Sequence, residues 1–163
     1  MAPLLTDRAA VRLRPATDAD REFLIDLYGS VRAEELALVT WAPGQREAFI
    51  RMQFAAQDTE YRRHNPHGTF DVIEFHSEPV GRLYVDRRPT EIRIVDISLL
   101  PQFRGAGIGS GLLDDLMREA ASIDRRLTIH VEISNRAETL YARLGFVEAA
   151  RQGPYRRMEW AAS

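Results

Sequence analysis

The chain has 163 residues, of which 45% are hydrophobic and 28% are charged, and its formal net charge is −2. This length predicts a single domain over residues 1–163 with its own hydrophobic core. The near balance of basic and acidic residues provides no positively charged surface for nucleic acid or an anionic membrane. The sequence has no cysteine, which excludes disulfides, thiolate metal sites and a cysteine nucleophile and is compatible with a cytoplasmic location.

Two further features narrow the range of functions. The first ten residues (MAPLLTDRAA) lack the apolar segment of a signal peptide, and no run approaches the ~18 apolar residues of a membrane span. Four histidines are the only imidazoles, and His64 and His67 fall in a polar HNPH turn that is typical of an exposed loop. We therefore predict that the protein binds no metal.

The first half of the chain predicts mostly helices. Residues 11–14 alternate apolar and charged and predict a short strand. Thr17 is a preferred N-cap residue, and Asp20, three positions later, resembles the acidic member of a capping box. A short helix is expected over residues 33–38, ended by the breakers up to Gly44, and a longer helix over residues 45–62.

The second half alternates strands and helices. The patterns predict strands over residues 69–76 and 79–86, joined by a two-residue gap at Ser77-Glu78, and then a long strand from residue 91. A helix follows from residue 108, and its apolar stripe consists of Ile108, Leu112, Leu116, Ala120 and Ile123. The chain then continues with a strand over 127–132, a helix over 135–144 that stops at Gly145, and closing strands over 146–149 and 155–160. This order indicates a mixed α/β sheet with helices on both faces.

One stretch, residues 91–113 (EIRIVDISLLPQFRGAGIGSGLL), combines a β-branched strand, a stop at Pro101 and a glycine-rich turn that opens a helix. Glycine is needed where the backbone approaches a ligand closely or adopts dihedral angles that a Cβ forbids. A helix N-terminus presents unpaired N–H groups and partial positive charge. The stretch therefore predicts a binding site for a phosphate group.

Spacing separates the classes of phosphate site. A P-loop needs a lysine after its last glycine, but Gly109 is followed by Ser110 and Gly111. A dinucleotide fingerprint needs G-x-G-x-x-G, and the registers starting at Gly105 and at Gly107 both lack the third glycine. A purely structural turn is the remaining alternative. It is disfavoured because each glycine inside a helix costs roughly 1 kcal/mol relative to alanine.

The residues Gln102, Arg104, Gly105, Ala106 and Gly107 resemble the Q/R-x-x-G-x-G/A signature of the GNAT acyltransferase superfamily. Asn135, Tyr141 and the pair Gly145-Phe146 stand downstream at the family's usual spacing, and the order of elements is similar over nearly the whole chain. The resemblance implies a mixed, mostly antiparallel sheet of six to seven strands with about four helices on both faces. It also implies acetyl-CoA as the co-substrate.

The resemblance assigns roles around the cofactor. The backbone of Ile97 and Leu99 would pair with the pantetheine arm, as an added strand would. Asn135 is expected to cap its helix and to contact that arm. The turn that would receive the pyrophosphate consists of Gln102, Arg104, Gly105, Ala106, Gly107, Ile108, Gly109 and Ser110.

Acetyl transfer to an amine needs a neutral nucleophile, stabilisation of the developing oxyanion and protonation of the departing thiolate. Tyr141 matches the family tyrosine that contacts the CoA sulfur and serves as general acid. Glu91 stands thirteen residues before Arg104, as the glutamate base of the histone-acetylating branch does. Asp96 lies mid-strand, where a carboxylate must reach the cleft or pair with an arginine such as Arg82 or Arg93. Some members use only water as the base.

The sequence thus predicts an acetyl-CoA-dependent N-acetyltransferase that acts by direct attack in a ternary complex, because the chain has no cysteine for a covalent intermediate. A non-catalytic acyl-CoA sensor or interaction module on the same fold is the alternative. The acceptor is expected to be a small-molecule amine, an amino acid or a peptide N-terminus, and a homodimer is compatible with the sequence. The family's acceptor region corresponds here to Glu34, Glu35, Trp41, Gln53, Gln57, Tyr61, Arg82, Tyr84 and Asp86.

Overall fold

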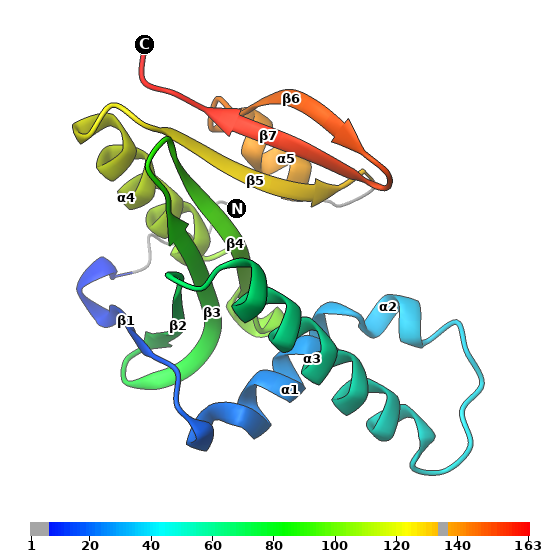
Figure 1. Ribbon diagram of the computed structural model, residues 1–163. Coiled ribbons are helices and arrows are strands. Elements are labelled where there is room, and N and C mark those ends of the chain that lie inside the picture. Colours follow the sequence, from blue (N-terminus) through cyan, green and yellow to red (C-terminus); the bar gives the residue numbers. More distant parts are fainter. Residues whose placement is uncertain (1–6, 134–136) are drawn as a thin grey trace.

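The computed structural model describes residues 7–133 and 137–163. In these ranges the chain forms a seven-stranded sheet in the order β1-β2-β3-β4-β5-β7-β6 (Figure 1). The strands are β1 (Val11–Pro15), β2 (Thr69–Phe75), β3 (Glu78–Arg87), β4 (Glu91–Leu99), β5 (Arg126–Glu132), β6 (Val147–Gln152) and β7 (Tyr155–Trp160). The α-helices are α1 (Arg21–Val31), α2 (Ala33–Leu36), α3 (Gln45–His64), α4 (Ile108–Ser122) and α5 (Ala137–Arg143). The predicted mixed, mostly antiparallel sheet is confirmed.

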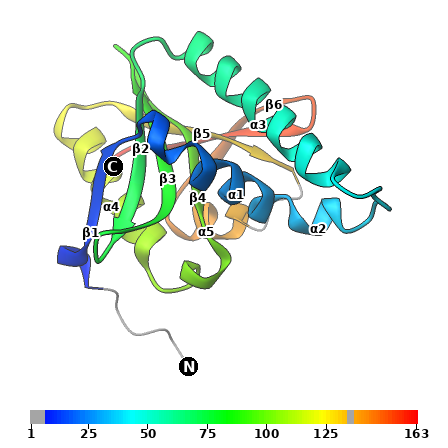
Figure 2. The ribbon, with the colours of Figure 1, turned by 90° about the horizontal axis from the view of Figure 1, so that it is seen from below.

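Helices cover both faces of the sheet and define two cores. Figures 1 and 2 show α1 and α3 on one face and α4 and α5 on the other. The larger core lies under α4 and α5, where Leu113 and Ala120 of α4 pack on Ile92 of β4 and Leu127 of β5. The smaller core is formed by apolar side chains of α1, α2 and α3. Each face of the sheet is therefore covered by helices that carry buried apolar side chains.

The pair β4–β5 is the one parallel pair among the described strands, and it is short. It joins four residue pairs, from Glu91↔Arg126 to Ile94↔Ile129. A parallel pair needs a crossover, which α4 supplies. Against β3, Tyr84 opposes Asp96 and Val85 opposes Ile94, so Val95 is an extra, bulged residue. β4 and β5 therefore cease to pair where β4 is bulged.

Two element boundaries differ from the sequence prediction around a hairpin. The two residues between β2 and β3 are His76 and Ser77, one position earlier than the predicted gap, because Phe75 pairs with Glu78. Both loop residues have positive φ, 50° and 67°. A two-residue hairpin loop of this kind matches the right-handed twist of the flanking strands.

Helix and strand ends account for the other differences. α2 stops at Leu36, whose carbonyl accepts the indole N–H of Trp41 at 2.9 Å, so the predicted helix over residues 33–38 is too long. Ile123 is 43% exposed, because it follows the last residue of α4 instead of extending its buried stripe. Phe146 lies in the core beside Tyr141, so β6 begins at Val147. The predicted helix start at Asn135 falls outside the described residues.

A buried carboxylate fixes the passage from β1 into α1. Both oxygens of Asp20 accept hydrogen bonds from Arg14 at 2.8 Å, and one also accepts the backbone N–H of Thr17 at 2.8 Å. Asp20 is 7% exposed. These contacts, chiefly the hydrogen bonds from Arg14, lower the pKa of Asp20 from 3.8 to about 2. The predicted Thr17–Asp20 cap is therefore tied to the first strand as well.

This interaction predicts a pH dependence of stability. Because the folded pKa of Asp20 lies below its unfolded value, the stabilisation is complete above pH 3.8 and is lost as the pH falls towards 2. Asp20→Asn should lower the free energy of unfolding at pH 7 and flatten its decline over that window, as measured by urea unfolding at several pH values. The exposed neighbour Asp18→Asn is the control. An unchanged pH profile in Asp20→Asn would contradict this prediction.

Candidate active site

The end of the β4–β5 pairing creates an open backbone edge on β4. Beyond Ile94 no described residue of β5 pairs with β4. The N–H of Leu100 donates to Val80 of β3 at 2.9 Å, so alternation along the strand directs the polar groups of Ile97 and Leu99 away from β3, towards the gap. The side chains of Ile97 and Leu99 meanwhile pack against the larger core. The structure thus gives these two residues the edge that strand-like pairing with a ligand requires.

The glycine-rich turn lies directly after this edge and opens α4. Gly105 has φ 74° and Gly107 has φ 92°, a region that residues with a Cβ rarely adopt. Gly107 caps α4 without a side-chain hydrogen bond, and the first turn of the helix carries no acidic residue. Arg104 directs its Nε at the Leu99 carbonyl, at 3.0 Å, which ties the turn to the strand. The N-terminal N–H groups of α4 are thus suited to an anion.

The other two glycines of the motif have different surroundings. A Cβ at Gly109 would lie 3.8 Å from Leu99, an ordinary contact, and Gly109 does not have positive φ. Gly111 lies against Arg8, which donates to the Gly111 carbonyl at 3.0 Å and also binds Asp115. Arg8, which sequence reasoning missed, thus braces the first turns of α4 from the N-terminal segment. Only two of the four glycines are demanded by backbone geometry.

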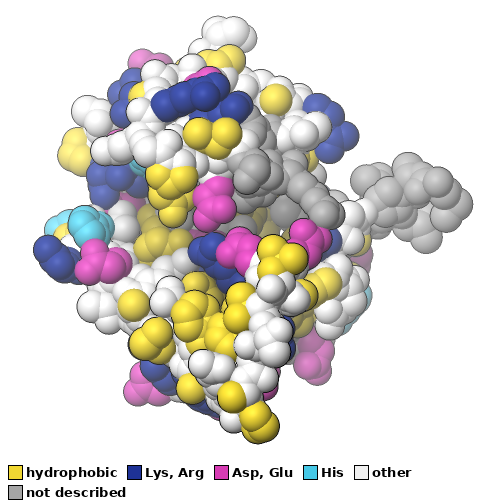
Figure 3. All heavy atoms as spheres, turned by 90° about the vertical axis from the view of Figure 1, so that its right-hand side faces the viewer, with side chains coloured by type: hydrophobic (Ala, Val, Ile, Leu, Met, Phe, Trp, Pro, Cys, Tyr) yellow, Lys and Arg dark blue, Asp and Glu magenta, His cyan; other side chains and the backbone are white. Residues whose placement is uncertain are grey.

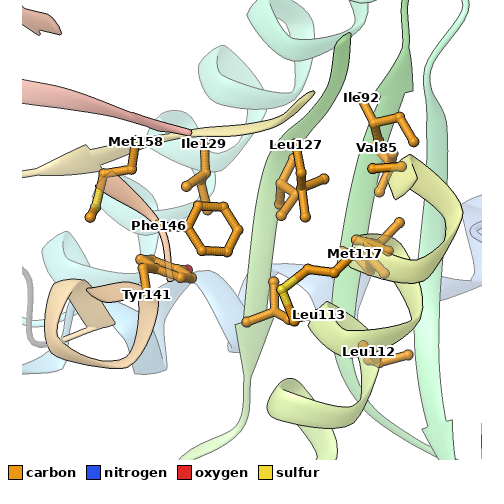
Figure 4. Close-up of a cluster of buried hydrophobic side chains, with 14 of the residues drawn as sticks. Val85, Ile92, Leu112, Leu113, Met117, Leu127, Ile129, Tyr141, Phe146 and Met158 are labelled. Atoms are coloured by element: carbon orange, nitrogen blue, oxygen red, sulfur yellow. The ribbon is translucent and has the colours of Figure 1, made fainter. Parts of the chain in front are cut away.

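Tyr141 comes to the same region from α5. Its ring packs at 5.6 Å from Phe146 and only 4% of the residue is exposed (Figure 4). Burial, and then the negative charge of Asp96, raise the pKa of Tyr141 well above its usual range. The hydroxyl is therefore harder to deprotonate than that of an exposed tyrosine. The effect of Asp96 also means that these two predicted site residues lie within electrostatic reach of each other.

Asp96 faces the opposite side of the sheet, towards α3. Its Oδ2 accepts Arg82 at 2.6 Å and the Tyr61 hydroxyl at 3.0 Å, and its Oδ1 accepts the Ser98 hydroxyl at 2.6 Å. The Arg82 side chain is 3% exposed and that of Asp96 13%. Of the alternatives that the sequence left open for Asp96, an approach to the cleft or an arginine partner, the structure shows the arginine partner, Arg82. Sequence reasoning missed Ser98, although its place two residues along the same strand is the signal that could have found it.

Glu91 is not brought together with Tyr141 and Asp96. It begins β4, five residues before Asp96, which corresponds to about 16 Å of extended strand. Its carboxylate accepts the Thr128 hydroxyl and, at 3.1 Å, Arg93. Burial would raise the pKa of Glu91, but Thr128 and Arg93 outweigh it and the net shift is downward. Glu91 therefore lies where β4 and β5 are still paired, with its carboxylate bound to neighbouring side chains.

An ion-pair cluster lies between the α1–α2 corner and the end of β5. Arg32 is 3.5 Å from a carboxylate oxygen of Glu35 and equally far from one of Glu132, and its guanidinium lies 5.5 Å from the centre of the Tyr28 ring. Figure 3, which views the molecule from the right-hand side of Figure 1, shows basic and acidic side chains gathered near its middle. We call Arg32, Glu35 and Glu132 the rim cluster. It joins the corner between α1 and α2 to the end of β5.

Most of the remaining predicted site residues lie at or just before the start of α4. Asn135 falls outside the described residues. Gln102 lies in the short 3₁₀ turn before the glycines, and Ile108 and Ser110 lie in the first turn of α4. Within the described ranges, no group of three or more histidine, cysteine or acidic side chains could hold a metal ion. None of the helices in those ranges combines the length and apolarity that crossing a membrane requires.

Comparison with known proteins identifies the family. The acetyltransferase (GNAT) domain model matches residues 66–148, just over half of the chain, and the chain therefore belongs to the GNAT acetyltransferase family. The match begins just before β2 and ends in β6, and so contains the glycine turn, Asp96 and Tyr141.

Solved structures share the whole fold. The PaiA N-acetyltransferase of Thermoplasma acidophilum, solved in complex with coenzyme A, is 17% identical, with a TM-score of 0.70 over 93% of this chain and 99% of that one. An acetyltransferase of Thermus thermophilus is 19% identical, with a TM-score of 0.68 over 98% and 99%. RimL, a ribosomal L7/L12 alpha-N-protein acetyltransferase, is 20% identical, with a TM-score of 0.64 over 99% and 96%. At these identities the likeness shows a common fold.

The glycine turn yields a stability prediction. Gly107→Ala should cost about 1–2 kcal/mol, because alanine would have to adopt a positive φ. Gly109→Ala should be neutral or stabilising, because its site is a regular helix position with room for a Cβ. Denaturant unfolding of both variants measures the difference. Equal destabilisation of the two would show that backbone conformation does not decide the glycine at position 107.

Proposed function

We propose that this protein is an acetyl-CoA-dependent N-acetyltransferase that moves an acetyl group to a primary amine by direct attack in a ternary complex. The observation that carries the proposal is the divergence of β4 and β5 at the Val95 bulge, beside the glycine turn. Tyr141 approaches this gap from the α5 face and Asp96 from the α3 face. A thioester held in the gap would be accessible to an acid from one side and an amine from the other.

The cofactor half of the site fits acetyl-CoA. The backbone N–H groups from Arg104 to Ser110 would receive the pyrophosphate, since the N-terminus of α4 has neither a side-chain cap nor an acidic residue. Gly105 and Gly107 supply the positive φ angles that orient this turn. The polar backbone groups of Ile97 and Leu99 would pair with the amides of the pantetheine arm. The bound co-substrate supplies an acetyl thioester.

Tyr141 is the proposed general acid. When the amine nitrogen forms its bond to the acetyl carbon, the carbon–sulfur bond breaks and the departing thiolate needs a proton. The Tyr141 hydroxyl carries a proton at neutral pH, as a tyrosine with the ordinary pKa of about 10 also would, and burial and then the charge of Asp96 raise its pKa further. The packing of its ring against Phe146 holds the side chain on α5 in a fixed position.

Of the two predicted carboxylates, Asp96 is the better candidate for the group that interacts with the acceptor amine. The acceptor arrives as an ammonium ion and must give up a proton before it attacks. Both carboxylates accept hydrogen bonds from neighbouring side chains, so their positions decide: Asp96 lies past the bulge, on the face opposite Tyr141, whereas Glu91 lies where β4 and β5 are still paired. Asp96 would attract the ammonium, and the proton would leave to Asp96 or to water. The acceptor is a small amine or a peptide N-terminus, and a cytoplasmic location is compatible with such substrates.

Tyr141→Phe tests the acid. We expect kcat to fall about 100-fold or more, because general acid catalysis typically contributes at least that factor. The dissociation constant for acetyl-CoA should change little, since the ring remains. Thiol release over a panel of amines measures kcat, and calorimetric titration with acetyl-CoA measures binding. Unchanged activity in Tyr141→Phe would remove Tyr141 as general acid.

The same two measurements distinguish an enzyme from the alternative. Acetyl-CoA binding without thiol release to any amine would indicate an acyl-CoA sensor or interaction module on this fold. Absence of binding at millimolar acetyl-CoA would reject both functions.

A pair of isosteric variants separates the two carboxylates. Asp96→Asn should lower kcat/KM for the amine by about 100-fold, whereas Glu91→Gln should leave it nearly unchanged. Each substitution replaces one oxygen by an NH₂ group at almost constant volume, so each serves as the control for the other. The reverse order of effects would assign the role to Glu91, and an unaffected kcat/KM in both variants would indicate water as the base.

A further inference from the structure

The face of the sheet that α3 covers further along is open over the C-terminal strands. In Figure 1, α5 lies behind β5, β7 and β6, and no described helix lies in front of them. Alternation along β5 places Ile129 in the core and His130 on the opposite, open face. His130 is exposed, and it is the first residue of β5 beyond Ile129, where the pairing with β4 ends. His130 therefore lies where the two strands part, on the side from which the acceptor would approach.

Two arginines flank His130 from the neighbouring strands. Arg157 of β7 is its direct partner in the register, and Arg93 of β4 pairs with Thr128, two residues before His130 and on the same face. Opposed and diagonal side chains on one face of a sheet lie within reach of each other. The side chain of Arg157 is 40% exposed and that of Arg93 is 25% exposed. We call Arg93, His130 and Arg157 the basic cluster.

The carboxylates beside the basic cluster do not match its arginines in number. One oxygen of Glu91 lies 3.1 Å from Nη2 of Arg93. Oε1 of Glu159 lies 3.4 Å from Nε of Arg157 and 3.3 Å from Nη1 of Arg126. The Nε of Arg157 has no hydrogen-bond partner among the described residues. Three arginines thus share two carboxylates here.

The other charged side chains around the cluster do not remove this excess. They form one-to-one ion pairs, which are Arg82–Asp96, Arg32–Glu132 and Arg88–Asp86. The pKa of His130 is lowered, first by burial and then by Arg93 and Arg157, whose effects exceed the opposite effect of Glu91. The electrostatic potential at His130 is therefore positive, which favours an anion at this place.

We propose that Arg93, His130 and Arg157 form a binding subsite for a carboxylate of the acceptor, and that the protein selects amines that carry such a group. This inference rests on the proposed acetyltransferase function and specifies its substrate class. Arginine and protonated histidine are charged donors, and their hydrogen bonds to a carboxylate are stronger than those between neutral groups. The subsite adjoins the gap between β4 and β5, so an acceptor bound there would have its amine near the thioester. A free amino acid and a peptide with an acidic side chain both supply a carboxylate.

Matched acceptors that differ in one carboxylate test the proposal. The first pair is phenylalanine and phenylalaninamide, and the second is C-terminally amidated Ala-Glu and Ala-Gln. With wild-type protein and acetyl-CoA, kcat/KM should be at least about tenfold higher for the carboxylate-bearing member of one pair. A preference in the first pair identifies free amino acids as the source of the carboxylate, and one in the second identifies peptides. Equal or lower values in both pairs would overturn the proposal.

Variants assign the preference to the basic cluster. Arg93→Gln and Arg157→Gln should each bring the ratio of the preferred pair at least about threefold closer to one, through a higher KM for the carboxylate-bearing amine. The KM for acetyl-CoA should stay constant. Comparing the ratio between wild type and variant cancels any difference in basicity between the two amines. Arg157→Lys retains the charge and should retain part of the preference.

A surface arginine provides the matched control. Arg118 lies on α4, its side chain is 72% exposed and it pairs with Asp114. Arg118→Gln removes the same charge from the molecule and should leave the ratio unchanged. Ratios that are unaltered in both Arg93→Gln and Arg157→Gln, or altered equally in Arg118→Gln, would show that the basic cluster does not recognise the carboxylate.

His130 reports on the subsite without turnover. Because burial and then the two arginines lower its pKa in the free protein, a bound carboxylate should raise that pKa, by about one unit. NMR titration of the imidazole signals over pH, in the presence of CoA, measures this shift with phenylalanine and with amidated Ala-Glu. His130→Gln identifies the signal among the four histidines. The uncharged member of each pair should shift the pKa less, and an unmoved pKa with both carboxylates would contradict the subsite.

Each outcome bears on one of the two proposals. Failure of acetyl-CoA to bind in calorimetry would reject the proposed function itself. If acetyl-CoA binds and amines are acetylated without preference for a carboxylate, the proposed function stands and the subsite is wrong. If acetyl-CoA binds and no amine is acetylated, catalysis fails, and the NMR titration of His130 alone decides whether the basic cluster binds a carboxylate.

Discussion

The local loss of pairing between β4 and β5 is the constraint on which the rest of the site depends. A parallel strand pair normally satisfies the backbone groups of both strands. Here the pairing stops after Ile94, because Val95 is bulged and the two strands diverge. The other edge of β4 remains paired with β3, in the antiparallel direction, as far as Leu99. A ligand can therefore meet polar backbone on a strand that remains rigid.

The bulge also determines which face of the sheet each side chain of β4 occupies. Ile92 and Ile94 before it, and Ile97 and Leu99 after it, all face the core under α4. An unbroken alternation would have placed Asp96 on that apolar face, where an ionised carboxylate is costly. The extra residue turns Asp96 and Ser98 towards α3 instead, where Arg82 and Tyr61 hold the carboxylate. One inserted residue thus supplies both the open backbone edge and the polar face of the site.

Sequence reasoning found the features that depend on local chemistry and missed several contacts between residues far apart in the sequence. The glycine turn was predictable, because positive φ at Gly105 and Gly107 is a property of single residues. The pairing of Asp96 with an arginine followed from the cost of burying a charge. The thirteen-residue spacing of Glu91 from Arg104 carried no information on where β5 leaves β4. Likewise, the support of α4 by Arg8 joins residues about a hundred positions apart, which local patterns do not reveal.

The end of the β4–β5 pairing also lets a charge on one face of the sheet act on a group on the other face. Asp96 belongs to the α3 face and Tyr141 to the α5 face, and a continuous sheet would separate them by a layer of backbone and apolar side chains. Burial is the first cause of the raised pKa of Tyr141, and the charge of Asp96, which acts where β4 and β5 part, adds to it. Under the proposed mechanism, one carboxylate would therefore face the acceptor amine and also act on the hydroxyl that protonates the departing thiolate. The position of that carboxylate is set by Arg82, Tyr61 and Ser98.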